Sequence, residues 1–297
     1  MKKSIFILFF LVIKISAGYS QTKAVVIDST TSKTVPYVNI WVENENNGTT
    51  SNDYGEFIIN ETDSTKNIVF SAIGYKRETV QISQIKNIIY LKPETTVLEE
   101  VVVTKKKESK KIVIDKFKKS KIHFYYGSGK TPWMVGKYFP NEDKYSDTPF
   151  IKEFAFLTNS EIENAKFNIR LYEYDSLNFI GNSVYDKNII SSVKKGKKTT
   201  IIDISDLNIK IPQKGLVVIV EWLIIEDNKR EFTVISEGKR KMKIAYAPMF
   251  GAVAKNTNKH AMIYRGEWMN SYKNPSQSIK NYKDKYSELA VSLTLTN

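Results

Sequence analysis

The chain contains 297 residues, with 45 lysines and arginines against 32 acidic residues, 2 histidines and no cysteine. Its length predicts two domains, and a hydrophobic fraction of 41% excludes wholesale disorder. Without cysteine the chain has no disulfide framework, thiol nucleophile or thiolate-held metal, and two histidines are too few for a multi-histidine metal site. We therefore expect no metal ion and no cofactor.

The N-terminus has the pattern of a secretory signal peptide. A short cationic start (MKK) precedes an apolar run at residues 4–13, which is about half the length that spans a bilayer. The small residues Gly18 and Ser20 then stand at the −3 and −1 positions of a cleavage site before Gln21. The alternative is that the apolar run is a buried strand or helix of the mature fold. We predict that residues 1–20 are a signal peptide.

Export follows from this prediction, and the location is then the periplasm, the outer membrane or the cell surface. No later stretch approaches 18 uninterrupted apolar residues. We therefore expect no transmembrane segment in the mature chain.

The first predicted domain, residues 21–103, reads as short strands separated by tight turns. Val38, Ile40 and Val42 alternate with polar or amphipathic residues, which is the period of a half-buried strand. The turns at 46–48 and 52–55 contain Asn, Asp and Gly, residues that tolerate positive φ. Seven short β segments without helical periodicity predict a small β-sandwich.

Four ordered motifs in this region carry a resemblance to a known family. They are Pro36-Tyr37-Val38-Asn39, the turn at 48–57, the SAIGY segment at 71–75 and the closing strand at 98–103. In this order they resemble the carboxypeptidase-D regulatory-like domain of exported Bacteroidetes proteins. The resemblance implies a transthyretin-like, seven-stranded sandwich that serves as an accessory module without catalytic residues. It does not imply a peptidase, because the zinc-binding domain is a different part of those enzymes.

Residues 104–130 are the predicted linker between the domains. This stretch contains nine lysines between positions 105 and 121, a composition that favours solvent exposure. Contact with anionic envelope polysaccharide or lipid is the alternative. Nucleic acid is not expected, because the protein is predicted to be exported and the run lacks the arginines that favour phosphate and base recognition.

Residues 131–297 are predicted to form a second β-sandwich. Phe167, Ile169 and Leu171 alternate with polar residues, and the apolar run at 216–225 is typical of a central strand buried on both faces. Alternation continues to the C-terminus. Segments of this region also resemble a poorly characterised C-terminal region found after such modules, which implies a jelly-roll-like sandwich. The predicted fold is therefore all-β with two sandwich domains.

The sequence contains no GxGxxG or GxxxxGK[ST] nucleotide-binding motif, no HExxH zinc-protease motif and no GxSxG esterase motif. The carboxylate pairs Glu173/Asp175 and Asp203/Asp206 are candidates for a hydrolase, but they more commonly face solvent or cap turns. Glu221 lies inside the apolar run and needs a partner, such as an arginine. The two histidines lie in polar, basic surroundings. We therefore expect no catalytic residues and no enzyme.

The main binding candidate is the stretch 264–286, where aromatic and basic residues are interleaved. Aromatic rings stack on sugar or peptide faces, and cations pair with anionic groups. The alternative is that the aromatic residues only cover the end of the sandwich. The predicted binding residues are Trp268, Tyr272, Lys273, Lys280 and Tyr282.

Together these features predict an exported, non-catalytic binding or assembly module that contacts a cell-envelope protein or polysaccharide. Two alternatives remain open at the level of sequence. One is a surface glycan-binding protein, and the other is a carboxylate-dependent hydrolase.

Overall fold

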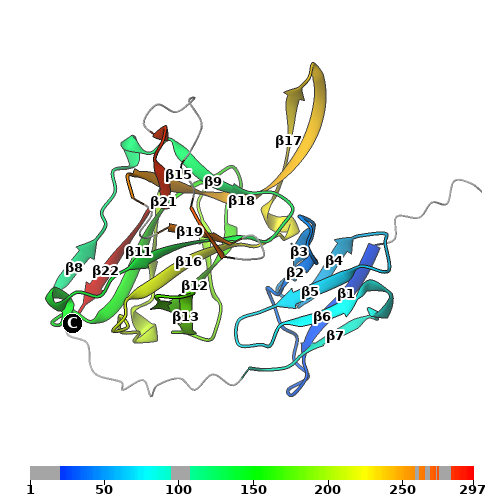
Figure 1. Cartoon of the computed structure of the whole chain (residues 1–297), viewed down its shortest axis with the longest axis horizontal. Helices are drawn as coiled ribbons and strands as arrows, with labels where there is room; N and C mark the ends of the chain where they lie inside the picture. The colour runs from blue at the N-terminus through cyan, green and yellow to red at the C-terminus, as the bar shows by residue number, and fades with distance from the viewer. Residues whose placement is uncertain (1–20, 95–107, 258–260, 265–267, 272, 274–281) are drawn as a thin grey trace, which may run out of the picture.

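The structure is a computed structural model that describes residues 21–94, 108–257, 261–264, 268–271, 273 and 282–297. Two β-rich domains follow each other along the chain (Figure 1). The only helices in the described part are short 3-10 turns. The prediction of an all-β protein with two sandwich domains is confirmed. The predicted signal peptide lies outside the described residues.

The N-terminal domain is built from seven strands in two sheets. One sheet has the order β4-β1-β7 and the other β3-β2-β5-β6. The strands are β1 (Gln21–Asp28), β2 (Asn39–Val42), β3 (Gly48–Thr50), β4 (Glu56–Asn60), β5 (Asn67–Ser71), β6 (Glu78–Gln81) and β7 (Ile88–Leu91).

Alternating side chains form the core between these sheets. In β4, Phe57 and Ile59 are buried whereas their neighbours in the strand are exposed. Phe57 meets Phe70 of β5 edge to face, with ring centroids 5.5 Å apart. The turn before β4 needs Gly55, whose φ is +76° and whose absent Cβ would lie 2.9 Å from the Val26 carbonyl oxygen. The predicted period-two pattern thus places the apolar face inward.

The C-terminal domain is a larger sandwich of two facing sheets. A seven-stranded sheet has the order β13-β12-β16-β10-β19-β20, and β14 also pairs with β12. Its strands are β10 (Met134–Phe139), β12 (Ala165–Asp175), β13 (Phe179–Ser183), β14 (Ile189–Val193), β16 (Leu216–Trp222), β19 (Ala261–Tyr264) and β20 (Trp268–Asn270).

The second sheet of this domain has eight strands. The order β17-β18-β11-β22-β8 forms its main path, with β15 on β11 and with β9 and β21 on β18. Its strands are β8 (Lys111–Ile114), β9 (Phe124–Ser128), β11 (Phe150–Ser160), β15 (Gly196–Asp203), β17 (Lys229–Ser236), β18 (Lys239–Lys255), β21 (Tyr286–Leu289) and β22 (Val291–Thr296).

The core of the C-terminal domain is rich in aromatic residues. Every residue of β16 is buried, as the apolar run predicted for a central strand. Trp222 stacks on Trp133 with centroids 5.0 Å apart, and its indole N–H donates to the Pro248 carbonyl oxygen at 2.6 Å. Phe250 of β18 meets the Trp222 ring edge to face, which joins the two sheets.

The C-terminal domain begins earlier than the lysine-rich composition predicted. β8 pairs with β22, and β9 pairs with β18, so both strands belong to the eight-stranded sheet. Ile112 and Ile114 pack against the core while the alternating residues are exposed. A period-two strand can therefore carry lysines on its solvent face, and the predicted linker 104–130 is wrong for the described residues from Lys111 onward.

Within the described residues, no helix combines the length and the apolar character needed to cross a membrane.

Candidate functional site: a cationic pocket

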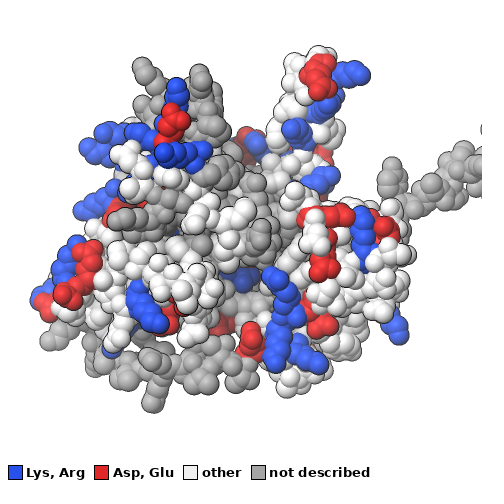
Figure 2. Space-filling view, viewed as in Figure 1, with Lys and Arg blue, Asp and Glu red and all other residues white. Residues whose placement is uncertain are grey.

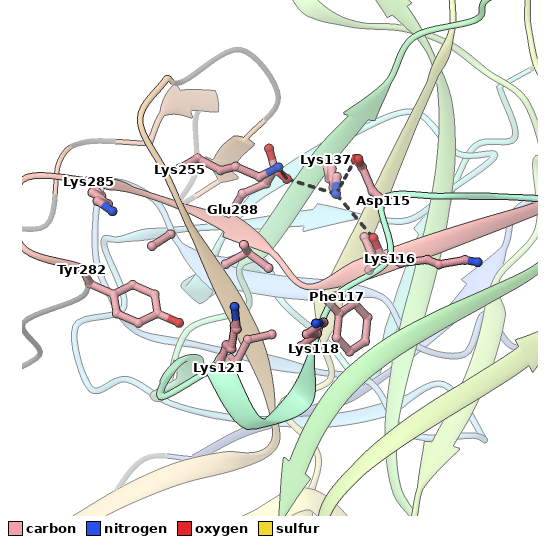
Figure 3. A pocket seen from close by; sticks show the side chains of 14 residues that line it. Asp115, Lys116, Phe117, Lys118, Lys121, Lys137, Lys255, Tyr282, Lys285 and Glu288 are labelled. Atoms are coloured by element: carbon pink, nitrogen blue, oxygen red, sulfur yellow. Dashed lines mark hydrogen bonds and ion pairs between the residues drawn. The ribbon is translucent and has the colours of Figure 1, made fainter.

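A pocket of about 410 Å³ opens on the C-terminal domain, where segments far apart in the sequence meet (Figure 3). This volume lies in the range of small-molecule sites. We call it the cationic pocket because six lysines and two acidic residues line it. Its lining comprises Asp115, Lys116, Phe117, Lys118, Lys121, Ile122, Lys137, Val253, Ala254, Lys255, Tyr282, Lys285, Glu288 and Val291.

Lys137 forms the base of the cationic pocket. It lies on β10 between two core positions, and its side chain is 2% exposed. Its ammonium lies 2.8 Å from Asp115 Oδ2 and 3.0 Å from Glu288 Oε1, and it donates to the Val291 carbonyl oxygen at 3.4 Å. A buried ammonium needs such partners, because desolvation penalises an unpaired charge. The two acidic residues of the pocket are therefore engaged at its base.

The remaining cations surround this base. Lys255 lies 3.5 Å from Glu288 Oε1 and shares that carboxylate with Lys137. The loop after β8 contributes Lys116, Lys118 and Lys121, all exposed, and Lys285 faces them across the pocket (Figure 3). In the described part of the chain, no acidic residue forms an ion pair with Lys116, Lys118, Lys121 or Lys285. The charge of these four lysines is therefore available to a ligand.

The pocket walls also provide apolar surface. Phe117 is half-buried against Ile122, and the side chains of Val253 and Val291 lie along the lining. Lysine ammoniums bind carboxylate and phosphate groups as point charges, while an aromatic or aliphatic wall accepts the carbon face of a ligand. The arrangement is therefore suited to an anion that also has an apolar face, such as an acidic sugar unit.

The stretch 264–286 contributes less exposed aromatic surface than the sequence suggests. Trp268 of β20 is half-buried and packs on the outer face of the seven-stranded sheet with Met134 and Ile219. Tyr282 is only 1% exposed, and its hydroxyl donates to the Ala252 carbonyl oxygen at 2.7 Å. A stacking role for Tyr282 is therefore wrong, because its ring is packed between strand β18 and Phe124.

Among the other predicted binding residues, Lys273 is exposed, with its ammonium 5.8 Å from the centroid of the Tyr286 ring. Tyr272 and Lys280 lie outside the described residues. Of the three predicted residues that the structure describes, Tyr282 lines the cationic pocket, whereas Trp268 and Lys273 do not. The ligand role of Trp268, Tyr272, Lys273 and Lys280 stays a prediction.

No sequence pattern indicates Lys137, Asp115 and Glu288 as a group. Lys137 shares its strand face with the core residues Val135 and Phe139, so the sequence feature that could have revealed it is a lysine at an inward position. Its two partners are 22 residues earlier and 151 residues later, and only the sheet brings them together. The lysine-rich loop was recognised, but as a linker.

Among the candidate carboxylates, Asp175 has a structural role. Asp175 accepts from the backbone N–H groups of Leu177 and Asn178 at 2.8 and 2.7 Å, and these hydrogen bonds lower its pKa. It therefore caps the turn after β12, one of the two roles considered for it. Among the described residues, no group of three or more His, Asp or Glu side chains could hold a metal ion.

The buried Glu221 has the arginine partner that its position requires. Arg170 of the neighbouring strand donates to both carboxylate oxygens, from Nε and Nη2 at 2.8 Å each. Asn168 Nδ2 donates at 2.8 Å, and Asn39 Nδ2 of the N-terminal domain donates as well. Although burial opposes the charged form, the Glu221 carboxylate holds the pKa of Arg170 above its usual value.

The comparisons with known proteins address the N-terminal domain, whose seven strands and turn motifs are described above. Residues 23–103 match the family model of the CarboxypepD_reg-like domain. They form a CarboxypepD_reg-like domain. The predicted domain resemblance is thus confirmed for these residues, and no curated protein matches the chain.

Among solved structures, the chain is similar to the crystal structure of the cysteine protease and lectin-like domains of Cwp84, a surface layer associated protein of Clostridium difficile. The sequences are 11% identical and the TM-score is 0.38. The similarity covers 84% of this chain and 45% of that chain, so this chain spans less than half of its length. A likeness at this level carries no argument about function.

The CarboxypepD_reg-like domain is docked on the C-terminal domain next to the Glu221 network. Tyr37 packs with Leu223 and Ile225 in one apolar cluster. The backbone N–H of Thr50 donates to the Ile224 carbonyl oxygen at 3.2 Å, and the Ile224 N–H donates to Thr50 Oγ1 at 2.9 Å. The two domains thus share buried apolar and polar contacts, which favours a fixed relative orientation.

Proposed function

We propose that the protein is an exported, non-catalytic binding module that holds an anionic polysaccharide of the cell envelope in the cationic pocket. The single observation that carries this proposal is the composition of the pocket. Its two acidic residues are engaged with Lys137 at the base, and lysines from three separate segments surround the opening. Such convergence of one sign of charge raises the local concentration of an anionic ligand.

The accessory nature of the CarboxypepD_reg-like domain supports a binding role. The buried contacts around Glu221 and Thr50 allow this domain to present the pocket-bearing domain in a defined orientation. Catalysis has less support, because Asp175 caps a turn and Glu221 is fully engaged by its partners. We therefore propose that the protein binds without turnover.

The envelope location rests on the N-terminal signal pattern at residues 1–20. N-terminal sequencing of protein recovered from the cell envelope should start at Gln21 or a few residues away. A full-length cytoplasmic product would contradict export.

The ligand class can be tested with a charge series of oligosaccharides. Polygalacturonate fragments carry one carboxylate per sugar, and neutral dextran fragments of equal length are the matched control. We expect the purified protein to bind the acidic fragments and not the neutral ones, as measured by titration calorimetry. Affinity should fall as salt rises, because charges at an exposed site are screened over about 8 Å at physiological ionic strength. Equal binding of the two series would contradict the proposal.

A further inference from the structure

A long β-hairpin projects from the C-terminal domain (Figure 1). It consists of β17 and the first half of β18, residues 229–246, and we call it the hairpin arm. The two strands pair over their whole length, from Lys229 with Tyr246 to Ser236 with Lys239. A two-stranded ribbon alone is marginally stable in water, and a third strand or a packed face is normally needed. Within the described residues, the arm alone therefore lacks the third strand or packed face that would stabilise it.

The two faces of the hairpin arm differ. Directly paired residues share a face, so the pairs Thr233–Met242 and Ile235–Arg240 lie on one face of the ribbon. Ile235 is 78% exposed and Met242 is 72% exposed. Lys241 and Lys243 lie on the opposite face with Val234 and Phe232. The first face therefore exposes Ile235 and Met242 beside Arg240, and the second combines two lysines with Phe232 and Val234.

The two edges of the hairpin arm also differ. β17 pairs only with β18 among the described strands, so its outer edge has no partner there. Its sequence EFTVIS at 231–236 is rich in β-branched and aromatic residues, which suit a strand that accepts another strand. The matching part of β18 contains Lys239, Arg240 and Lys241, and such charged residues protect an edge from pairing. The β17 edge is therefore the open one.

The positive charge of the arm indicates the charge of the molecule that could bind it. Six basic residues and two acidic residues occupy positions 229–246, and basic side chains are spread along the arm in Figure 2. In the described part of the chain, Lys239, Arg240 and Lys243 form no ion pair. A second copy of the arm would carry the same positive charge, so like-charge repulsion disfavours self-pairing.

We propose that the hairpin arm is a docking site for an extended, acidic segment of a partner protein, which adds to the free edge of β17 as a third strand. Alternate side chains of the added strand would point to opposite faces of the ribbon. Apolar side chains on one face cover the region of Ile235 and Met242, and acidic side chains on the other lie beside Lys241 and Lys243. This interaction is separate from the cationic pocket and does not depend on its ligand.

The test uses the full mature protein and a blocked octapeptide of alternating valine and glutamate. Binding is measured by fluorescence anisotropy, and hydrogen exchange of the protein locates the contact. We expect binding together with slower amide exchange in residues 230–236. A peptide with lysine in place of glutamate and a valine–glutamate peptide interrupted by proline are the matched controls, and both should bind at least tenfold more weakly.

Variants of the protein then separate the two faces. Ile235→Lys should weaken binding about tenfold, and so should Lys241→Glu combined with Lys243→Glu. Leu177→Lys, at a 91% exposed position elsewhere, and Lys76→Glu with Lys92→Glu are matched controls that should bind normally. Thermal melts of all variants are the check that each one is folded.

Three results would overturn the proposal. The first is peptide binding without protection of β17. The second is binding of anionic lipid vesicles, but not of the peptide, through Ile235 and Met242, which would make the arm a membrane contact. The third is self-association in sedimentation that Ile235→Lys abolishes.

Discussion

At the scale of single residues, Glu221 shows how a charge is accommodated in a central strand. Its carboxylate is fully buried and receives hydrogen bonds from Arg170, Asn168 and Asn39. A buried ion pair adds little net stability, but removing one partner leaves an uncompensated charge. Its position in the apolar run predicted a partner, either an arginine or a hydrogen-bond donor at a strand edge. Asn39 could not be foreseen, because it lies 182 residues away in the other domain.

Glu221→Gln should therefore destabilise the protein strongly. It leaves the Arg170 guanidinium buried without a counter-charge, and we expect a loss of about 3–5 kcal/mol in the free energy of unfolding. Urea denaturation measures this loss. Glu237→Gln, at an 83% exposed side chain, is the matched control and should change stability by less than about 0.5 kcal/mol. Equal midpoints for the two variants would contradict the role of the network.

Asp53 gives the domain junction a dependence on pH. The Tyr37 hydroxyl donates to its carboxylate and Lys166 of the C-terminal domain lies 3.0 Å away, and these contacts lower the pKa of Asp53 from 3.8. A lowered carboxyl pKa contributes stability above its unfolded value, and that contribution is lost as pH falls through the folded-state value. The pKa of Tyr37 shifts in the opposite direction, because burial and the Asp53 carboxylate raise it to about 12.

Asp53→Asn should therefore lower the free energy of unfolding at neutral pH and leave it unchanged in acid. We expect the urea midpoints of the variant and the wild type to differ at pH 7 and to converge as pH falls below 3.8. Circular dichroism at a series of pH values provides the measurement. A difference that stays constant from neutral pH into acid would show that Asp53 does not contribute through its charge.

At the scale of elements, alternation predicted most strands of both sandwiches, and its failures have a physical reason. The region of β8 was assigned to the linker, with a short helix or strand as an option, because lysines dominate the surrounding sequence, although Ile112 and Ile114 have the period of a strand. The cationic pocket was also beyond sequence reasoning. Its base joins β10, β21 and the loop after β8, and pairing of distant strands alone brings these segments together.

Trp268 of β20 tests whether the aromatic stretch packs or binds. Its ring lies against the sheet, 3.7 Å from the position that a Cβ on Gly136 would occupy. Because the side chain is half-buried, Trp268→Ala should lower the free energy of unfolding by roughly 2 kcal/mol, less than a fully buried tryptophan would. A melt and a polygalacturonate titration of the same sample separate the two roles. Unchanged stability with lost binding would make Trp268 a ligand residue instead.

At the scale of the whole molecule, the two domains form one docked unit. Thr50 and Ile224 exchange hydrogen bonds across the junction, and Tyr37 packs against Leu223 and Ile225. Inter-domain contacts that combine buried apolar and charged groups restrict domain motion. The sequence predicted two domains correctly as separate sandwiches, but it gave no sign of their association, because the contacting residues come from strand ends and turns.

Trypsin should reveal this association. The run Lys105-Lys106-Lys107 offers adjacent cleavage sites between the domains, whereas Lys111 is paired into the sheet with β22. We expect a cut at 105–107 to give two fragments that still elute together in gel filtration. Separation of the fragments without denaturant would contradict stable docking.

The central claim is that the cationic pocket, and not overall positive charge, binds an anionic envelope polysaccharide. The most direct measurement is calorimetric titration of polygalacturonate fragments into Lys118→Gln/Lys121→Gln and into Lys76→Gln/Lys92→Gln. Both pairs are exposed and remove the same net charge, but only the first lines the pocket. The account predicts about five- to tenfold weaker binding for the first variant, as two lost exposed ion pairs would give, and nearly normal binding for the second. Equal weakening of both variants would contradict it.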